Sequence, residues 1–362
     1  MTDQNFYHVS TPGRICLFGE HQDYLGLPVI PCAISLRISI EGRRCPAPLV
    51  RLDLPDIGSS FDIRLDRPVS YQEERDYFRS SIVVLQKEGF RFSTGFEGTV
   101  HGEIPINSGT SSSSALVVSW VNLLARLADV PKILSPDQIA RLAHRAEVLE
   151  FGEPGGMMDH FSTSFGGVLH VAFHPEIAIR LLSPKLGSFV LGDSLQPKDT
   201  KGILARVKNG VLRISKTLAS KDPAFSLHTA DPDSIGKYDR ILNRDEAALL
   251  TGTLRNRDIT RRALDLLSPA SPDQNVLGRL LNDHQAELRD RLKISTPKID
   301  RMIDAALAAD ALGGKINGSG GGGCMFVYCP QKPEEVAEAV RRAGGKAWVV
   351  HCDVGTTVEI RE

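Results

Sequence analysis

The sequence has no apolar run of the length that crosses a membrane, although 41% of its residues are hydrophobic. No positively charged segment followed by an apolar stretch opens the chain, so no secretory leader is expected. The formal net charge of the 362 residues is only -1, which gives no reason to expect a nucleic acid or a membrane surface as a partner. The composition is that of an ordinary soluble globular protein.

The six cysteines are few and scattered along the chain. They form neither the close pairs of a zinc site nor the regular spacing of a disulfide framework. Several lie in apolar, strand-like runs, where a buried free thiol is the usual state. We therefore expect a cytoplasmic protein. The cysteines are Cys16, Cys32, Cys45, Cys324, Cys329 and Cys352.

Two common phosphate-binding signatures are also missing. No spaced glycine loop ends in Gly-Lys-Ser or Gly-Lys-Thr, so the chain has no Walker A loop. It also contains neither a His-Arg-Asp segment nor Asp-Phe-Gly, which mark protein kinases. P-loop NTPases and protein kinases are therefore excluded.

The most informative stretch that is present is a glycine- and serine-rich turn at residues 105–116. Serine oxygens at a helix start can cap it, and the first backbone N–H groups have no partner inside the helix. Those donors and the positive end of the helix dipole favour an anion, most often a phosphate. A capped helix after a flexible turn explains this stretch equally well when it is taken alone. The apolar residues with helical spacing are Leu116, Val117, Trp120, Leu123, Leu124 and Leu127.

The order of predicted elements indicates an α+β protein. Residues from about 198 to 312 are mostly helical, whereas strands dominate before residue 190. A chain of this length also exceeds the usual size of one hydrophobic core. We therefore expect two domains, residues 1–190 and 191–362. The predicted strands are 14–18, 29–40, 96–104, 168–173, 189–191, 324–328 and 347–352, and the predicted helices include 72–88, one from a capping box at Ser135, one from Thr296, and 333–343.

Three segments in this order resemble the motifs of the GHMP small-molecule kinase superfamily, and the resemblance covers essentially the whole chain. They are the segment around Gly19-Glu20-His21-Gln22-Asp23-Tyr24, the serine turn, and the glycine run 318–323. The first segment is typical of the galactokinase branch, because mevalonate kinases share Gly-Glu-His but lack the following Asp-Tyr. The resemblance implies a two-domain GHMP kinase fold, with an N-terminal domain like ribosomal S5 domain 2 and a ferredoxin-like C-terminal domain.

The resemblance also implies the cofactors ATP and Mg²⁺. Backbone N–H groups of the serine turn would hold the nucleotide phosphates. A hydroxyl from Ser113 and a carboxylate from Glu147 would bind the metal ion, which keeps several waters. A cap hydroxyl and a solvated carboxylate are the alternative roles for this pair. The implied ATP-binding residues are Gly109, Thr110, Ser111, Ser112 and Ser113.

The implied catalytic pair is Asp159, which accepts the proton of the attacking hydroxyl, and Arg14, which holds that carboxylate charged. Glu20, His21 and Asp23 would bind sugar hydroxyls, since a polyol needs several directional donors and acceptors. The glycine run would shape the pocket through its backbone. The implied activity is ATP-dependent phosphorylation of a small-molecule sugar, most naturally the anomeric hydroxyl of galactose or a related sugar.

Residues 193–202 depart from the galactokinase pattern. They lack the tyrosine that approaches the sugar in galactokinases and resemble the mevalonate-type pattern more closely. Asn107 and Thr110 of the serine turn also differ from the usual residues. Two alternatives therefore stay open: a mevalonate-type kinase, and a sugar- and ATP-binding sensor without catalysis. The sequence makes no prediction of oligomeric state.

Overall fold

The computed structural model describes residues 5–198 and 200–361. Its strands are β1 (Phe6–Phe18), β2 (Ile30–Cys45), β3 (Leu49–Leu54), β4 (Ser59–Arg64), β5 (Gly95–Gly102), β6 (Val168–Ala172), β7 (Ala178–Leu182), β8 (Ser188–Asp193), β9 (Gly313–Ile316), β10 (Cys324–Tyr328), β11 (Lys346–His351) and β12 (Thr357–Arg361). Its α-helices are α1 (Tyr77–Lys87), α2 (Ser112–Leu127), α3 (Pro136–His144), α4 (Met158–Phe165), α5 (Thr200–Lys221), α6 (Arg244–Leu267), α7 (Gln274–Ala286), α8 (Pro297–Ala308) and α9 (Pro333–Arg342). Short 3-10 helices cover Asp23–Leu25, Pro55–Ile57 and Pro232–Tyr238, and π-helical turns extend α3 over Arg145–Leu149 and α7 over Glu287–Arg291.

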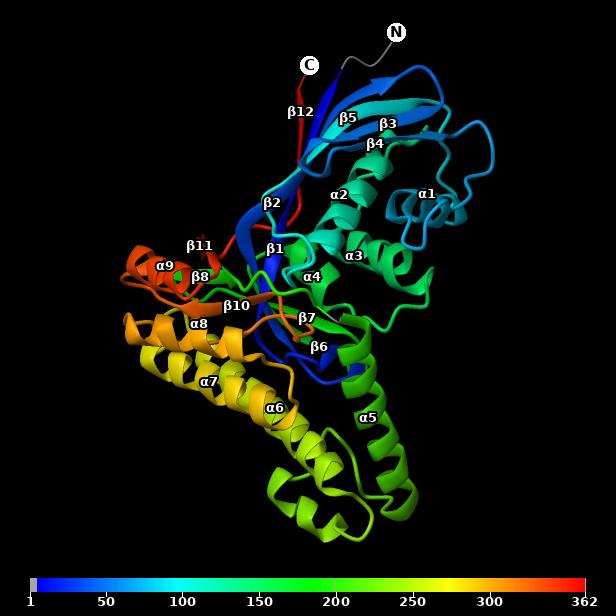
Figure 1. Cartoon of the computed structure of the whole chain (residues 1–362). Helices are drawn as coiled ribbons and strands as arrows, with labels where there is room; N and C mark the ends of the chain where they lie inside the picture. Colours follow the sequence, from blue (N-terminus) through cyan, green and yellow to red (C-terminus); the bar gives the residue numbers. More distant parts are fainter. Residues whose placement is uncertain (1–4, 199, 362) are drawn as a thin grey trace.

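The first sheet has the strand order β12-β1-β2-β5-β3-β4, with β6 pairing with β2 and β7 pairing with β6. Its two long strands, β1 and β2, pair antiparallel and run from this sheet down to the second one (Figure 1). Their pairing shifts between Pro12 and Gly13 and again between Cys16 and Phe18. Such irregularities bend a strand and can re-aim its side chains, and they fall on both sides of Arg14.

Helices α1 to α4 cover one side of the first sheet, beside its long strands (Figure 1). Helix α2 packs on β1 and β2 through the apolar face that its sequence spacing predicts. Trp120 is fully buried at its centre, and its indole N–H donates to the carbonyl of Phe78 over 3.0 Å. Burial of an aromatic residue this large contributes several kcal/mol to folding, about 25 cal/mol per Å² of apolar surface.

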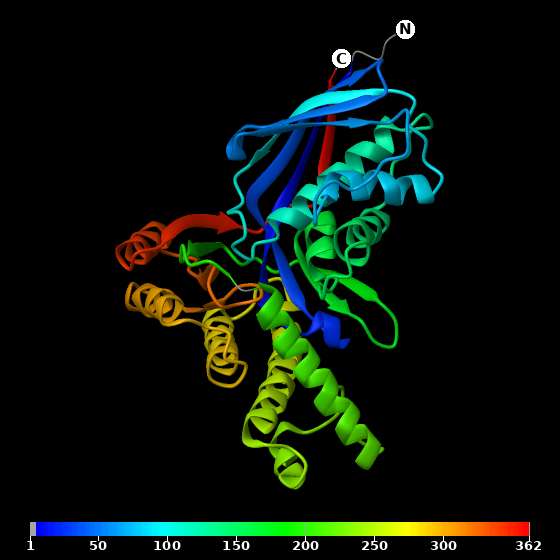
Figure 2. The same ribbon diagram turned by 45° about the vertical axis from the view of Figure 1, so that its right-hand side comes forward.

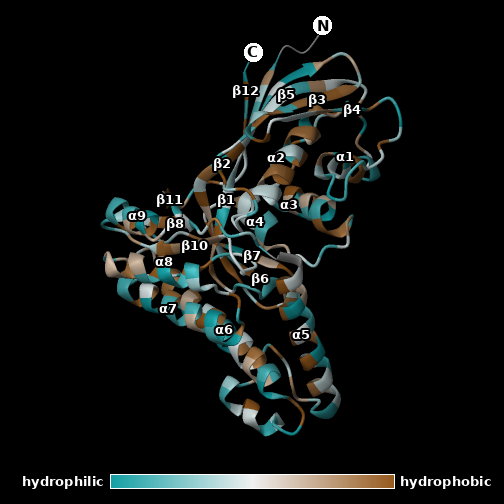
Figure 3. Ribbon diagram, in the orientation of Figure 1, coloured by the Kyte–Doolittle hydropathy of each residue, from teal (hydrophilic) through white to brown (hydrophobic). Residues whose placement is uncertain are grey.

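The second sheet has the strand order β11-β8-β10-β9, and all its pairs are antiparallel. Along the chain the order is strand, helices, two strands, helix and strand, which is the ferredoxin-like arrangement predicted for this part. Helices α8 and α9 pack against this sheet. Figure 3 shows apolar residues along the strands and polar residues on outer helices such as α7 and α9.

The two sheets share a hydrophobic core. The lower end of β1 buries Ile15, Leu17 and Phe18 against Phe189 and Phe326 of the second sheet. Helices α5 and α6 form a long pair whose far ends project away from both sheets in Figure 2, whereas the C-terminal half of α6 packs into the shared core through Ile259, Ala263 and Leu267. Strand β1 therefore reaches into both halves of the molecule.

Most predicted elements are present, and the differences have local causes. Strand β10 has the predicted bounds, and the Ser135 capping box and the Thr296 helix start are confirmed. The helix expected from residue 72 begins only at Tyr77, because Asp76 caps it by accepting from the Arg79 N–H. Strands β7, β9 and β12 were not predicted from the sequence.

The division into residues 1–190 and 191–362 stays a prediction. A cut at residue 190 falls inside β8. Strand β12 pairs with β1 in the first sheet, so the C-terminal segment lies beside the N-terminal strand (Figure 1). None of the helices within residues 5–198 and 200–361 is long and apolar enough to pass through a membrane.

Candidate active site

The serine turn and the glycine run lie backbone to backbone at the junction of the two halves. The Cys324 N–H donates to the Ser108 carbonyl over 2.7 Å, and the Asn317 amide donates to the Gly109 carbonyl over 2.8 Å. A Cβ on Gly318 would lie 2.9 Å from the Gly109 Cα, so a side chain there would push the segments apart. The two motifs therefore form one platform.

The serine turn does not form the side-chain cap that was one of the two interpretations of its sequence. The N-cap residue, Ser111, has a left-handed backbone with φ of 64° and makes no side-chain cap bond. An N-cap hydroxyl reaches the N–H groups of the first turn from an extended backbone. The first backbone N–H groups of α2 therefore remain available to donate hydrogen bonds to an anion.

The five predicted ATP-binding residues differ in what they expose. Thr110 is fully buried, and its hydroxyl lies 2.9 Å from that of Ser108, so only its backbone can meet a phosphate. Ser112 is half-buried and Ser113 is exposed. Gly109 offers backbone alone, and its carbonyl is already taken by Asn317 and Arg14.

Arg14 and Asp159, the predicted catalytic pair, are in direct contact. Arg14 Nε donates to Asp159 Oδ1 over 2.8 Å, and Nη2 lies 2.7 Å from the same oxygen in the ion pair. The guanidinium is 5% exposed, whereas the carboxylate is 29% exposed. Arg14 Nη1 also donates to the Gly109 carbonyl, so one side chain joins the carboxylate to the serine turn.

The charges of this pair stabilise each other. Burial opposes ionisation of Asp159, but the charges of Arg14 and of nearby His160 outweigh it and hold the pKa of Asp159 below its ordinary value. Burial lowers the pKa of Arg14, yet Asp159 and Glu20 more than compensate, so its net pKa is raised. Asp159 is therefore ionised near neutral pH and is a weak base.

Ser113 and Glu147, the predicted metal pair, lie together at the start of α2. Burial raises the pKa of Glu147, but a hydrogen bond from His160 and others from Ser113 and Ser114 bring the net pKa below its ordinary value. His160 Nε2 is 2.8 Å from Glu147 Oε2. The described residues contain no cluster of three metal-binding side chains. One carboxylate and one hydroxyl suit Mg²⁺, which takes its other oxygens from water and phosphate.

Glu20 and His21 are already bonded to protein groups. Glu20 Oε2 is 2.8 Å from Nζ of Lys315, and both side chains are buried. His21 Nε2 lies 3.0 Å from the Ser319 carbonyl and Nδ1 lies 2.6 Å from the Tyr24 hydroxyl. A carbonyl only accepts, so Nε2 carries the proton and Tyr24 donates to Nδ1. Burial lowers the pKa of His21 to about 4, so the ring is neutral. Both of its nitrogens serve to hold the loop.

Asp23 is the most accessible of the three predicted substrate-binding residues. Its carboxylate accepts from the Tyr24 and Met158 N–H groups over 2.9 and 3.2 Å. Burial, and then the negative charge of Asp159, raise the pKa of Asp23 to about 6. A Cβ on Gly156 would overlap this carboxylate, so a glycine is needed there. Met158, whose N–H donates to Asp23, directly precedes Asp159 in the chain, so Asp23 and Asp159 lie near one another.

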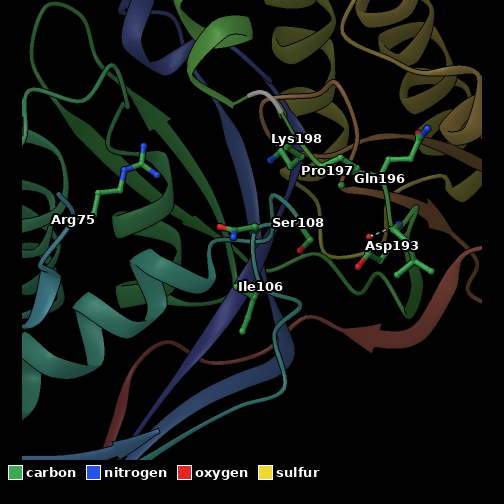
Figure 4. Close-up of a pocket in the computed structure, with 10 residues that line it drawn as sticks. Arg75, Ile106, Ser108, Asp193, Gln196, Pro197 and Lys198 are labelled. Atoms are coloured by element: carbon green, nitrogen blue, oxygen red, sulfur yellow. Dashed lines mark hydrogen bonds between the residues drawn. The ribbon is translucent and has the colours of Figure 1, made fainter. Parts of the chain in front are cut away.

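A cavity of about 660 Å³ opens beside the serine turn. Figure 4 shows Ser108 near the centre with Lys198 above it, Asp193 and Gln196 on one side and Arg75 on the other. The exposed apolar side chains of Ile106 and Leu195 also line it. Its volume is within the range of small-molecule sites.

Sequence reasoning missed four polar residues of this region. Lys315 and Asn317 precede the glycine run, to which only a backbone role was assigned. His160 follows Asp159 directly, and its distance from Glu147 along the sequence gave no indication that the two side chains are in contact. Lys198 lies in residues 193–202, and the departure of that segment from the galactokinase pattern was the only signal in the sequence that could have pointed to it. Asn317 Oδ1 accepts from the Cys16 N–H over 2.8 Å, which joins the start of the glycine run to β1.

Three family models match separate parts of the chain. Residues 2–44 match the galactokinase galactose-binding signature. Residues 76–167 match the GHMP kinases N terminal domain, and residues 263–346 match GHMP kinases C terminal. The three matched segments contain the first motif, the serine turn with Asp159, and the glycine run.

Full-length relatives include kinases with two different acceptors. A mevalonate kinase from Thermococcus onnurineus is 28% identical over 97% of both chains. A galactokinase from Actinobacillus succinogenes is 25% identical over 92% of this chain and 87% of its own. The crystal structure of Lactococcus lactis galactokinase complexed with galactose superposes with a TM-score of 0.84 at 22% identity, over 97% and 95% of the two chains. The chain belongs to the GHMP kinases and has their two-domain fold.

Proposed function

We propose that this GHMP kinase transfers the γ-phosphoryl group of ATP to a monosaccharide hydroxyl and yields a sugar 1-phosphate. Galactose or a related sugar is the proposed acceptor. One observation carries the proposal: the Arg14–Asp159 pair is anchored to the Gly109 carbonyl in a chain whose residues 2–44 match a galactose-binding signature. The carboxylate of Asp159 is thereby fixed next to the turn that would hold the phosphates.

The residues of the site divide the work of phosphoryl transfer. The start of α2 binds the phosphates through backbone N–H groups. Ser113 and Glu147 would hold Mg²⁺, which would supply positive charge to neutralise the phosphates. Asp159 orients the acceptor hydroxyl through its carboxylate, one oxygen of which is held by Arg14. Because Asp159 is a weak base, orientation and charge contribute more than early proton removal.

Substrate recognition falls mainly to Asp23, because Glu20 and His21 are occupied by Lys315, Tyr24 and Ser319. A carboxylate that is half-buried and already oriented by two backbone N–H groups can accept from sugar hydroxyls in a fixed direction. Glu20 and His21 then support the shape of this loop. This arrangement favours an uncharged polyol close to Asp23.

A mevalonate-type acceptor is the second candidate. It is favoured by the 28% identical mevalonate kinase and by Lys198, a cation in the segment after β8 that could attract a carboxylate-bearing substrate. The galactose-binding signature and the carboxylate of Asp23 favour the sugar. The two candidates differ in the charge of the acceptor, which an assay can separate.

The test is a panel of acceptors with ATP and Mg²⁺, measured by ADP release. Sugars and mevalonate are compared with the full chain and with Asp159→Ala. We expect turnover with a sugar, and its loss by at least about 10³-fold in Asp159→Ala with nucleotide affinity nearly unchanged. Turnover with mevalonate alone would establish the second candidate. Normal ATP binding with no turnover on any acceptor would instead identify a sensor.

A further inference from the structure

Lys198 approaches the serine turn from the opposite half of the molecule. It lies in the loop after β8, and it lines the cavity together with Ser108 and Gly323. A Cβ added to Gly109 would lie 2.8 Å from Lys198 Nζ, and one added to Gly323 would lie 2.6 Å from its Cδ. The stem of Lys198 therefore packs over one glycine and its ammonium over the other.

The ammonium of Lys198 is largely buried, and among the described residues the carboxylates that act on it do so without a direct ion pair. Burial and the positive charge of Arg14 lower the pKa of Lys198 to about 8, although Cys324, Glu20 and Asp159 act in the other direction. A half-desolvated ammonium beside the positive end of α2 is stabilised when an anion binds between them.

We infer that Lys198 binds the phosphoryl group while it moves from the nucleotide to the acceptor. Three sources of positive charge, Arg14, the start of α2 and Lys198, meet at the Gly109 backbone. They come from both halves of the chain, so a phosphate held there would be contacted from two sides. This inference rests on the proposed function and adds to it a catalytic residue.

Lys198 is chemically unchanged by the proposed transfer. The acceptor oxygen forms a bond to the γ-phosphorus as the bond from phosphorus to the bridging oxygen of ADP breaks. The acceptor proton leaves toward Asp159 or solvent. Lys198 keeps its proton and donates to a non-bridging oxygen, where charge must be neutralised during transfer.

The experiment compares the full-length protein with Lys198→Met and Lys198→Arg, and with Lys185→Met as a matched control at an exposed lysine outside the cavity. Dissociation constants for ATP and AMP are measured by calorimetry. Transfer is measured under single-turnover conditions with the acceptor found in the panel. Thermal unfolding of each variant checks that the fold is kept.

We expect Lys198→Met to weaken ATP binding at least tenfold while AMP binding stays within twofold. Transfer should slow by about 10²–10³-fold, the usual effect of removing one charge-stabilising donor. Lys198→Arg should keep part of the rate, and Lys185→Met should behave like the parent protein. The inference is overturned if Lys198→Met transfers within twofold of the parent, or if it loses AMP and ATP affinity equally. If no acceptor is turned over, the proposed function fails. The ATP and AMP affinities of Lys198→Met still show whether Lys198 contacts the outer phosphates of the nucleotide.

Discussion

Lys315 and Glu20 form a buried ion pair that joins the third motif to the first, with 2.8 Å between Nζ and Oε2. The same ammonium donates to the carbonyls of Cys16 and Ile316 over 2.9 and 2.7 Å. It also lies 5.1 Å from the centre of the Phe326 ring. Lys315 therefore ties β9 to the strand that carries Arg14.

Replacing Lys315 by Met should destabilise the protein by about 3–5 kcal/mol, because Glu20 would stay buried with no compensating charge. Chemical denaturation measures the change in the free energy of unfolding. The double variant Lys315→Met/Glu20→Gln should recover at least half of that loss. Equal stability of the single and double variants would show that the ion pair is not the cause.

The carboxyl of Asp23 should make stability depend on pH in a defined window. Burial raises its pKa from an ordinary value near 3.8 to about 6, so the folded protein holds a proton that the unfolded chain has lost between these values. The stabilisation from this group is fully present below pH 4 and is lost as the pH rises through 6. Asp23→Asn should therefore gain stability relative to the parent between pH 4 and pH 7.

That relative gain should be roughly 1–3 kcal/mol, since each tenfold change in proton affinity corresponds to about 1.4 kcal/mol. Free energies of unfolding from denaturant titrations at pH 4, 5, 6 and 7 give the curve. Asp53→Asn, at an exposed position on β3, is the control and should show no such trend. Parallel curves for Asp23→Asn and the parent would contradict the raised pKa.

His160 should tune the metal affinity of Glu147. Its Nε2 contacts Glu147 Oε2 at 2.8 Å, and groups that orient a metal ligand typically contribute 10–100-fold to affinity. His160→Gln should raise the Mg²⁺ concentration needed for half-maximal activity by about that factor, with activity restored at high Mg²⁺. His144, whose ring centre is 5.2 Å from that of His160, provides the control variant His144→Gln. An unchanged Mg²⁺ requirement in His160→Gln would refute this role.

Local patterns in the sequence predict the elements whose causes are local. Strand β10 is a short apolar run, and the capping box at Ser135 satisfies its own backbone groups within four residues. Asp159 and Arg14 could be paired only through a family resemblance, since 145 positions separate them. The structure brings Arg14 into contact with Asp159, and Ser113 into contact with Glu147. The roles of these four residues stay predictions.

Contacts between distant segments could not be predicted. Lys315 and Glu20 are 295 positions apart, and no periodicity in either segment links them. A capped helix start was one of two interpretations of the serine turn, and the left-handed backbone at Ser111, which makes no side-chain cap bond, cannot be read from the sequence. The contacts of His21 with Tyr24 and Ser319 cannot be read from the sequence, and the assignment of His21 to the substrate stays a prediction.

The pairing of β12 with β1 has a consequence for how the chain is made. Roughly 340 residues separate these strands, and at about 5–20 residues per second the ribosome needs roughly 20–70 s to bridge them. During that time β1 has an open edge at Phe6–Ser10, the part of the strand that precedes Arg14. The first sheet is completed last at the strand where the chain begins, so a nascent chain of this protein offers a clear site for chaperone binding before synthesis of β12.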